Sequence, residues 1–229
     1  MAGTVKLLAL ETSTLAGGAA LVDGDRLVGE STLNIRVTHS ERVLVAVDRL
    51  LADAGWRPSD LEGLAVSIGP GSFTGLRIGV STAKGLALAL RLAVAPVPTL
   101  DALAAALPWS ALPVCPVLGA RQGEVYASLY RWDGSGMRRE WDYLALTAAE
   151  LAARLTEPVV LLGDGAPTVS SPFARLAPLA RRFPSPACVA QLGQELLARG
   201  GGRPPAEIVP LYLRPSEAEL KRRRALALA

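Results

Sequence analysis

Glu11, Thr12 and Ser13 stand where an apolar stretch gives way to a polar turn, and the chain then returns through the small residues 17–20. Backbone N–H groups and hydroxyls in such a turn can hold a phosphate. The same hydroxyls could instead only satisfy the hydrogen bonds of the turn. Taken alone, these three residues leave both interpretations open.

The most distinctive stretch joins a short apolar strand to a long helix. It reads Gly69, Pro70, Gly71, Ser72, Phe73, Thr74, Gly75, Leu76, Arg77. A glycine turn before a helix N-terminus could hold an anion. However, no Lys followed by Ser or Thr comes after Gly75, so the stretch lacks the cation and the magnesium-binding hydroxyl of a Walker loop. A sharp chain reversal before a closely packed helix explains the glycines better.

Histidine and cysteine are too scarce for the common metal sites. His39 is the only histidine, and Cys115 and Cys188 are the only cysteines, without CxxC spacing. One histidine cannot form a two-histidine site, and two distant cysteines do not form a zinc ribbon. A lone histidine within the Thr38–Glu41 capping box is more typical of a helix start than of a catalytic triad, and no GxSxG elbow is present. We therefore predict no catalytic residue, no metal and no cofactor.

The elements that must position these residues alternate between strands and helices. Period-two and helical patterns predict strands at 5–10, 18–22 and 26–33, a helix at 40–54, a strand at 64–68, a helix at 73–90 and a strand at 93–97. The second half repeats this order imperfectly, with strands at 114–118, 125–132, 138–145 and 159–162 and a helix at 147–155. Residues 165–186 are expected to be irregular. This order predicts an α/β protein of two related lobes: residues 1–100, then a smaller degenerate lobe at 101–213, then a basic C-terminal helix at 214–229.

The predicted helix at 73–90 carries apolar residues around much of its surface, which indicates burial on more than one side. The small residues Gly75, Gly79 and Ala83 follow one another at four-residue spacing and would let another helix approach closely. We expect a partner chain to contact this helix and the one before it; the expected contact residues are Leu76, Gly79, Val80, Ala83, Val43 and Val47. The alternative is that the two helices of this chain cover each other and that the glycines face their own sheet.

Composition and charge indicate how the chain folds and where it is expected to act. Half of the 229 residues are apolar, which suffices for a substantial core without disulfides. We find neither a targeting segment nor a run of membrane-spanning length, so we expect a cytoplasmic protein without a membrane partner. The formal charge of +3 is concentrated in residues 214–229. A solvated helix face explains the run 221–224 at least as well as contact with nucleic acid does.

Five stretches in order resemble the TsaB (YeaZ) family over nearly the whole chain. They are residues 8–14, 38–41, 69–80, 120–126 and 210–214. The resemblance implies two RNase H-like lobes of the ASKHA (actin, sugar kinase, Hsp70) type, with Glu11, Thr12 and Ser13 as a degenerate phosphate hairpin. One departure is Gly119, where the family commonly has Asp.

The resemblance also implies a function. The chain would be a non-catalytic scaffold and dimerization subunit that pairs with a TsaD-like transferase and a TsaE-like ATPase. Their complex transfers threonylcarbamoyl to the adenosine beside the tRNA anticodon, so the chain would meet tRNA indirectly. TsaD-like subunits hold a metal with His-x-x-x-His, but here Val43 follows His39 at that spacing. Alone, the chain would form a homodimer.

Other functions remain alternatives at this stage. The fold could belong to an independent ASKHA-type ATPase or kinase, which would transfer phosphoryl groups as an isolated chain. A peptidase is a further alternative, but a nucleophile and base cannot be assembled from the sequence. A homodimer that serves only as a storage form would use the same helices.

Overall fold

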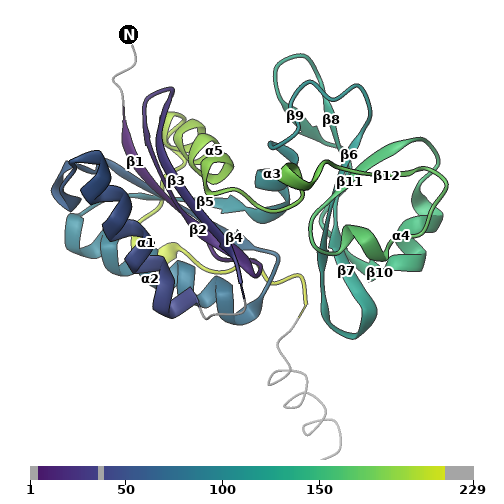
Figure 1. The fold of residues 1–229 in the computed structure, drawn as a ribbon, viewed down its shortest axis with the longest axis horizontal. Coiled ribbons are helices and arrows are strands. Elements are labelled where there is room, and N and C mark those ends of the chain that lie inside the picture. The colour runs from purple at the N-terminus through teal and green to yellow at the C-terminus, as the bar shows by residue number, and fades with distance from the viewer. Residues whose placement is uncertain (1–4, 36–38, 215–229) are drawn as a thin grey trace, which may run out of the picture.

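The computed structural model describes residues 5–35 and 39–214, without the side chains of residues 39–41 (Figure 1). Apart from Arg214, the predicted C-terminal helix at 214–229 with its basic residues 221–224 therefore lies outside the described part of the chain, as does the side chain of His39. None of the described helices is long and apolar enough to cross a membrane.

The first lobe is a five-stranded sheet between helices. Its strands are β1 (Lys6–Glu11), β2 (Ala16–Asp23), β3 (Arg26–Asn34), β4 (Gly63–Gly69) and β5 (Val94–Pro98), in the order β3-β2-β1-β4-β5. β1, β2 and β3 are antiparallel, whereas β4 and β5 run parallel to β1. Helices α1 (His39–Ala54) and α2 (Phe73–Leu90) cover one face, and α5 (Pro186–Ala198) covers the other (Figure 1).

Alternation along β1 builds both layers of the first core. Leu8 and Leu10 pack toward α1 and α2, while Leu7 and Ala9 pack toward α5. Successive side chains of a strand point to opposite faces, so a strand that is apolar at every position is buried on both sides. This explains why the opening stretch is continuously apolar up to Glu11.

The second lobe repeats this sheet arrangement with shorter strands. It contains β6 (Val114–Gly119), β7 (Glu124–Ala127), β10 (Leu144–Thr147), β11 (Val159–Leu162) and β12 (Ala174–Leu176) in the order β10-β7-β6-β11-β12, with α4 (Ala148–Arg154). Here β6 takes the central place of β1, with β7 antiparallel and β11 parallel to it. The repeated topology confirms the two-lobed RNase H-like fold.

Two predicted strands of the second lobe are each divided. Residues 125–132 form β7 and β8 (Tyr130–Trp132), and residues 138–145 form parts of β9 (Met137–Arg139) and β10. β7 pairs with the end of β6, whereas β8 pairs with its start and with β9. The Ser128 hydroxyl donates to the Trp141 carbonyl oxygen at 2.7 Å at this change of partner. Local periodicity does not reveal such a change, because both halves remain extended.

The lobes are joined through α3 (Thr99–Ala104), a short helix that the sequence patterns did not predict. The Asp101 carboxylate on α3 accepts hydrogen bonds from the hydroxyls of Tyr130 and Tyr143 in the second lobe. Burial raises the pKa of the Tyr130 hydroxyl, and the negative charge of the Asp101 carboxylate raises it further. Tyr130 therefore keeps its proton and donates it in this hydrogen bond. Asp101 thus ties the two lobes together through partly buried polar contacts.

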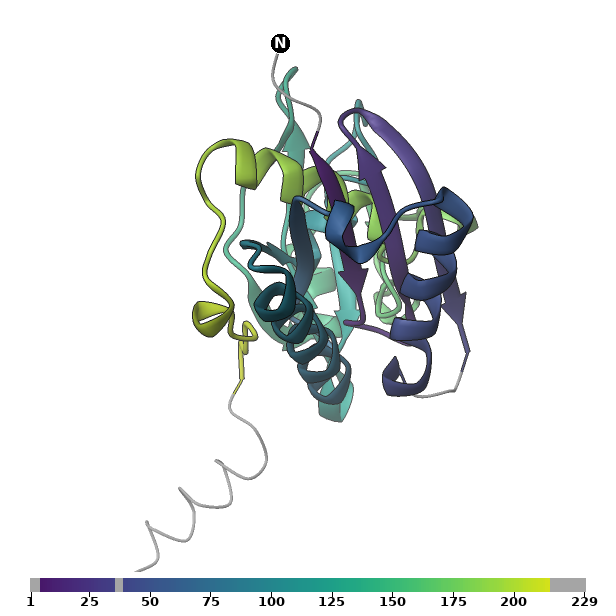
Figure 2. The same ribbon diagram turned by 90° about the vertical axis from the view of Figure 1, so that its left-hand side faces the viewer.

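The predicted boundary of the second lobe at residue 213 is wrong, because the chain returns to the first lobe at α5. This helix packs against β1, β2, β4 and β5, and the chain after it passes along the first lobe (Figures 1 and 2). Val94 and Arg203 exchange backbone hydrogen bonds of 3.0 and 2.9 Å. Residues 101–177 therefore form the junction and the second lobe, whereas residues 186–214 complete the first.

Candidate functional site

The hairpin of Glu11, Thr12 and Ser13 is docked on the glycine turn that precedes α2. The Ser72 N–H donates to the Ser13 carbonyl oxygen at 2.7 Å, and the Thr12 hydroxyl donates to the Gly75 carbonyl oxygen at 2.8 Å. The Ser72 hydroxyl in turn accepts from the Gly75 N–H at 3.2 Å, as an N-cap does. The hairpin predicted from the sequence and the glycine-containing stretch at 69–77 thus meet in one place, at the carboxyl ends of β1 and β4.

Two glycines make this contact possible. A Cβ atom on Gly71 would lie 2.4 Å from the Ser13 carbonyl oxygen, and one on Gly79 would lie 2.1 Å from the Thr12 hydroxyl oxygen. Real Cβ atoms do not approach other atoms this closely, so any side chain would push the hairpin away from α2. The glycines therefore serve close packing within the chain, as the sequence suggested for the turn.

Glu11 is fully buried and only half of its carboxyl group is hydrogen-bonded. Its Oε1 accepts from the Ser13 N–H at 2.6 Å and from the Ser13 hydroxyl at 2.5 Å, while Oε2 has no partner among the described residues. Burial raises the pKa of Glu11 above its ordinary value of 4.5, against the lowering effect of Ser13. The Ser67 hydroxyl also lowers this pKa, although it makes no hydrogen bond of ordinary geometry.

This arrangement leaves the hairpin little capacity to hold a phosphate. The Thr12 hydroxyl is used by the Gly75 carbonyl, the Ser13 hydroxyl is used by Glu11, and all three side chains are buried. A phosphate site needs free donors that face the ligand, and here those donors face the protein. The geometry therefore favours the structural interpretation of the hairpin over the phosphate-binding one.

The structure contradicts the placement of the six predicted contact residues on an exposed helix face. Leu76, Gly79, Val80, Ala83, Val43 and Val47 are all buried in the chain itself. Gly79 meets Thr12 of the first hairpin, and Val43, Val47, Val80 and Ala83 belong to the core between the helices and the sheet. The row of small residues was assigned to the wrong side of α2.

A different set of residues lies on the exposed faces of α1 and α2. On α1, Leu44 is 51% and Val45 47% exposed; on α2, Leu88 is 69% exposed. Ser81, Gly85 and Ala89 are also exposed on α2, at four-residue spacing. A Cβ atom on Gly85 would meet nothing within 4 Å. The sequence signal for this face was Gly85 itself, because glycine inside a helix lowers its stability and no packing within the chain explains it.

Aromatic and cationic side chains of the 69–77 stretch meet a segment that the sequence analysis did not connect with it. The Phe73 ring stacks on Tyr212 with centroids 5.1 Å apart, and the Arg77 guanidinium lies 5.2 Å from the centre of the Phe73 ring. The Leu211 N–H donates to the Ile68 carbonyl oxygen at 2.7 Å. Residues 208–214, which we call the C-terminal strap, therefore hold the start of α2 in place.

No cluster of three or more His, Cys, Asp or Glu side chains suited to a metal was found in the described part of the chain. Burial raises the pKa of the Cys115 thiol to about 12, which keeps this thiol neutral.

Gly119, the departure from the family pattern, lies at the end of β6, where its N–H donates to the Asp164 carboxylate at 2.9 Å. An acidic side chain from another strand end thus contacts this position.

Comparison with known proteins places these features in a family. The chain is 32% identical over 225 residues, 94% of this chain and 96% of the relative, to the tRNA threonylcarbamoyladenosine biosynthesis protein TsaB of Bacillus subtilis. The chain belongs to the TsaB (YeaZ) family. A second TsaB, from Escherichia coli, is 37% identical over 136 residues, which are 58% of each chain.

Solved structures and a family model agree with this membership. YeaZ from Pseudomonas aeruginosa superposes with a TM-score of 0.81 at 31% identity, covering 91% of this chain and 100% of that one. The family model described as TsaD, tRNA N6-adenosine threonylcarbamoyltransferase, matches residues 32–166. The match thus includes α1, α2 and most strands of the second lobe, whereas β1, β2 and α5 lie outside it.

Proposed function

We propose that the chain is the non-catalytic partner subunit in threonylcarbamoyl modification of the adenosine next to the tRNA anticodon. The observation that carries this proposal is the hydrogen bonding of the Glu11 hairpin. The Thr12 hydroxyl donates to Gly75 and the Ser13 hydroxyl donates to Glu11, so neither is free for a phosphate. A subunit with this hairpin contributes to the reaction through the proteins it binds. We place it in the cytoplasm with tRNA, which it reaches indirectly through the complex.

The exposed faces of α1 and α2 support pairing with a TsaD-like subunit. Leu44, Val45 and Leu88 present apolar surface, and Gly85 offers a close approach for another helix. Small residues at helix contacts allow backbones to approach and side chains to interdigitate. The match to the TsaD family model over residues 32–166, which include both helices, supports a pseudo-symmetric pair of related chains. Without that partner the same face would form a homodimer, and a TsaE-like ATPase joins the assembled pair.

Reconstitution of the reaction tests this proposal. The isolated chain should produce no modified adenosine in tRNA, whereas addition of a TsaD-like subunit, a TsaE-like ATPase and threonylcarbamoyl-AMP should give modification that depends on this chain. Mass spectrometry of digested tRNA measures the product. Turnover by the isolated chain, or unchanged modification when it is omitted, would refute the proposal, and ATP hydrolysis by the chain alone would favour an independent ATPase instead.

A further inference from the structure

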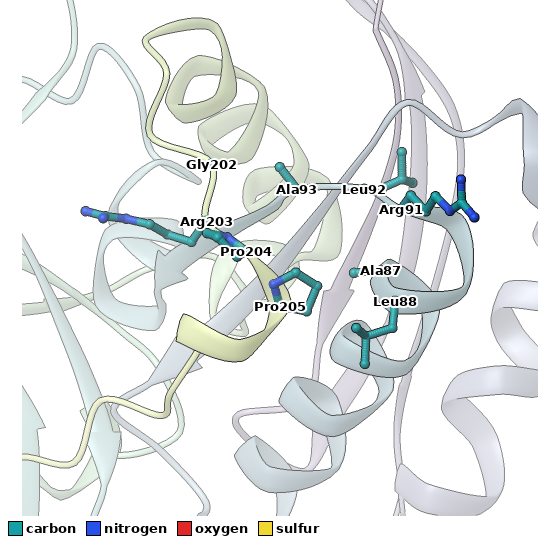
Figure 3. A pocket seen from close by; sticks show the side chains of 9 residues that line it. All are labelled: Ala87, Leu88, Arg91, Leu92, Ala93, Gly202, Arg203, Pro204 and Pro205. Carbon is teal, nitrogen blue, oxygen red and sulfur yellow. The ribbon is translucent and has the colours of Figure 1, made fainter.

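An open groove lies where the end of α2 faces the chain that leads to the C-terminal strap (Figure 3). Its volume is about 540 Å³, and its lining comprises Ala87, Leu88, Arg91, Leu92, Ala93 and residues 202–205. One wall is held by the paired backbones of Val94 and Arg203. The Lys84 ammonium donates to the Ala206 carbonyl oxygen at 3.4 Å and ties the same wall to α2. The groove is therefore bounded by fixed elements on both sides.

The lining of the groove combines an apolar floor with a rim of one charge sign. Leu88, Leu92, Pro204 and Pro205 supply apolar surface, and Arg91 and Arg203 are the charged residues that line the groove. In Figure 3 these two arginines extend to opposite sides of it. Glu207 contacts Arg203 at 3.8 Å, with both side chains more than half exposed, which leaves the arginine largely available to a ligand.

The groove continues the exposed face of α2. Leu88 lines the groove and also lies one helical turn after Gly85 on the exposed helix surface. Arg91 ends α2 in the left-handed conformation (φ 58°, ψ 41°), which glycine or asparagine usually occupies. Its charged side chain therefore stands at the boundary between the helix face and the groove.

We propose that this groove binds an acidic segment of the TsaD-like partner that carries one large apolar side chain. The apolar side chain would cover Leu88 and the two prolines, and carboxylates on either side would meet Arg91 and Arg203. A second copy of this chain fits less well, because docking groove to groove would bring these cations together. This inference rests on the proposed function, since it assigns the segment to the subunit that pairs with α2.

Charge reversal at the rim tests the inference. The full chain carrying both Arg91→Glu and Arg203→Glu is titrated by calorimetry against a purified TsaD-like subunit. We expect its dissociation constant to rise about tenfold at low salt, because complementary charges become like charges. The wild-type affinity should fall as salt rises from about 0.05 to about 0.5 M, whereas the variant should lose most of this dependence. The control is Arg154→Glu together with Arg175→Glu, two exposed cations of the second lobe outside the groove, which makes the same change in net charge and should behave as wild type.

A third variant separates the inference from the proposed function. Gly85→Leu alters the helix face outside the groove lining and should weaken pairing if α2 docks there. If Gly85→Leu weakens pairing and the double arginine variant, with unchanged melting temperature, binds as wild type does, the groove inference is wrong and the pairing stands. If the wild-type chain does not bind the TsaD-like subunit at all, the proposed function itself fails. Equal weakening by the double change Arg154→Glu and Arg175→Glu would mean that net charge alone acts, which also overturns the groove inference.

Discussion

Glu11 places a fully buried carboxyl group at the end of β1, and one of its oxygens has no partner among the residues that the structure describes. Because burial raises its pKa, the folded chain binds a proton more readily than the unfolded chain does. Stability from this group is fully present below the ordinary pKa of 4.5 and is lost as pH rises through the raised value. As pH rises above 4.5 the fold therefore loses stability from this group, until the raised pKa has been passed.

Replacement of Glu11 by Gln should remove this dependence. The amide is neutral at every pH, keeps an acceptor for Ser13, and can donate toward the Ser67 hydroxyl. We expect Glu11→Gln to melt at or above the wild-type temperature at pH 7 and to show a flatter stability profile between about pH 4.5 and about pH 8. Denaturant unfolding across this range measures the effect. A variant that is less stable than wild type at pH 7 but retains the wild-type pH profile would show that another group titrates.

Pairing with a partner should not respond to Glu11. The side chain is fully buried beside the hairpin and does not reach the exposed faces of α1 and α2. Glu11→Ala should therefore leave affinity for a TsaD-like subunit nearly unchanged, provided that the folded fraction is measured on the same preparation.

Gly79 and Gly85 lie on the same helix but have opposite surroundings. Gly79→Ala should destabilise the chain by about 2 to 4 kcal/mol, because the new Cβ displaces Thr12 and breaks its buried hydrogen bond to Gly75. Gly85→Ala should stabilise it by about 1 kcal/mol, because nothing surrounds this position and alanine favours a helix. Calorimetric unfolding of the two variants forms a matched comparison. Equal effects at both positions would contradict the orientation of α2.

At the scale of elements, α2 illustrates what the sequence could and could not establish. Its bounds, Phe73–Leu90, agree with the predicted helix, because Ser72 caps it and an unbroken helical pattern follows. Its orientation was assigned incorrectly. Apolar residues occur around much of the helix, so periodicity alone did not distinguish the side toward the sheet from the side toward solvent.

Helix α5 was overlooked even though it carries a local start signal. Ser185 caps its N-terminus, accepting from the N–H groups of Ala187 and Cys188, and Pro186 occupies its first turn. The Ser185 hydroxyl and the Ala187 N–H also donate to Glu30 on β3, which adds a favourable negative charge at the helix N-terminus. The pairing of α5 with a strand more than 150 residues earlier could not be inferred from local pattern, because it depends on the long-range path of the chain.

At the scale of the whole molecule, the C-terminal strap links both lobes. It bonds to the end of β4 through Leu211, stacks on Phe73 through Tyr212, and forms an ion pair from Arg214 to Glu124 on β7. The first two contacts lie in the first lobe and the third lies in the second. The strap therefore adds a second connection between lobes that α3 already joins.

Removal of the ion pair should loosen the strap without unfolding the chain. Arg214 and Glu124 are partly exposed, so Arg214→Ala should cost less than about 1 kcal/mol of global stability. Amide exchange at Leu211, whose N–H is bonded to Ile68, should nevertheless become several-fold faster. Arg199→Ala, which removes an exposed pair with Glu195 on α5, is the control and should leave Leu211 unchanged. Identical exchange in both variants would mean that the contacts of Leu211 and Tyr212 hold the strap without the ion pair.

The return of α5 to the first lobe has a consequence for synthesis on the ribosome. One face of the first sheet, which includes Leu7, Ala9, Ala65 and Ala95, is covered by residues near Val189 and Ala190. These residues emerge only after the whole second lobe has been translated, because chains grow from the N-terminus. The first half of the nascent chain therefore carries an uncovered apolar sheet while the second lobe is made. The first lobe closes only when β1 and α5 meet, and their residues Leu7 and Val189 are 182 positions apart (189 − 7), so its folding should be slow and completed last.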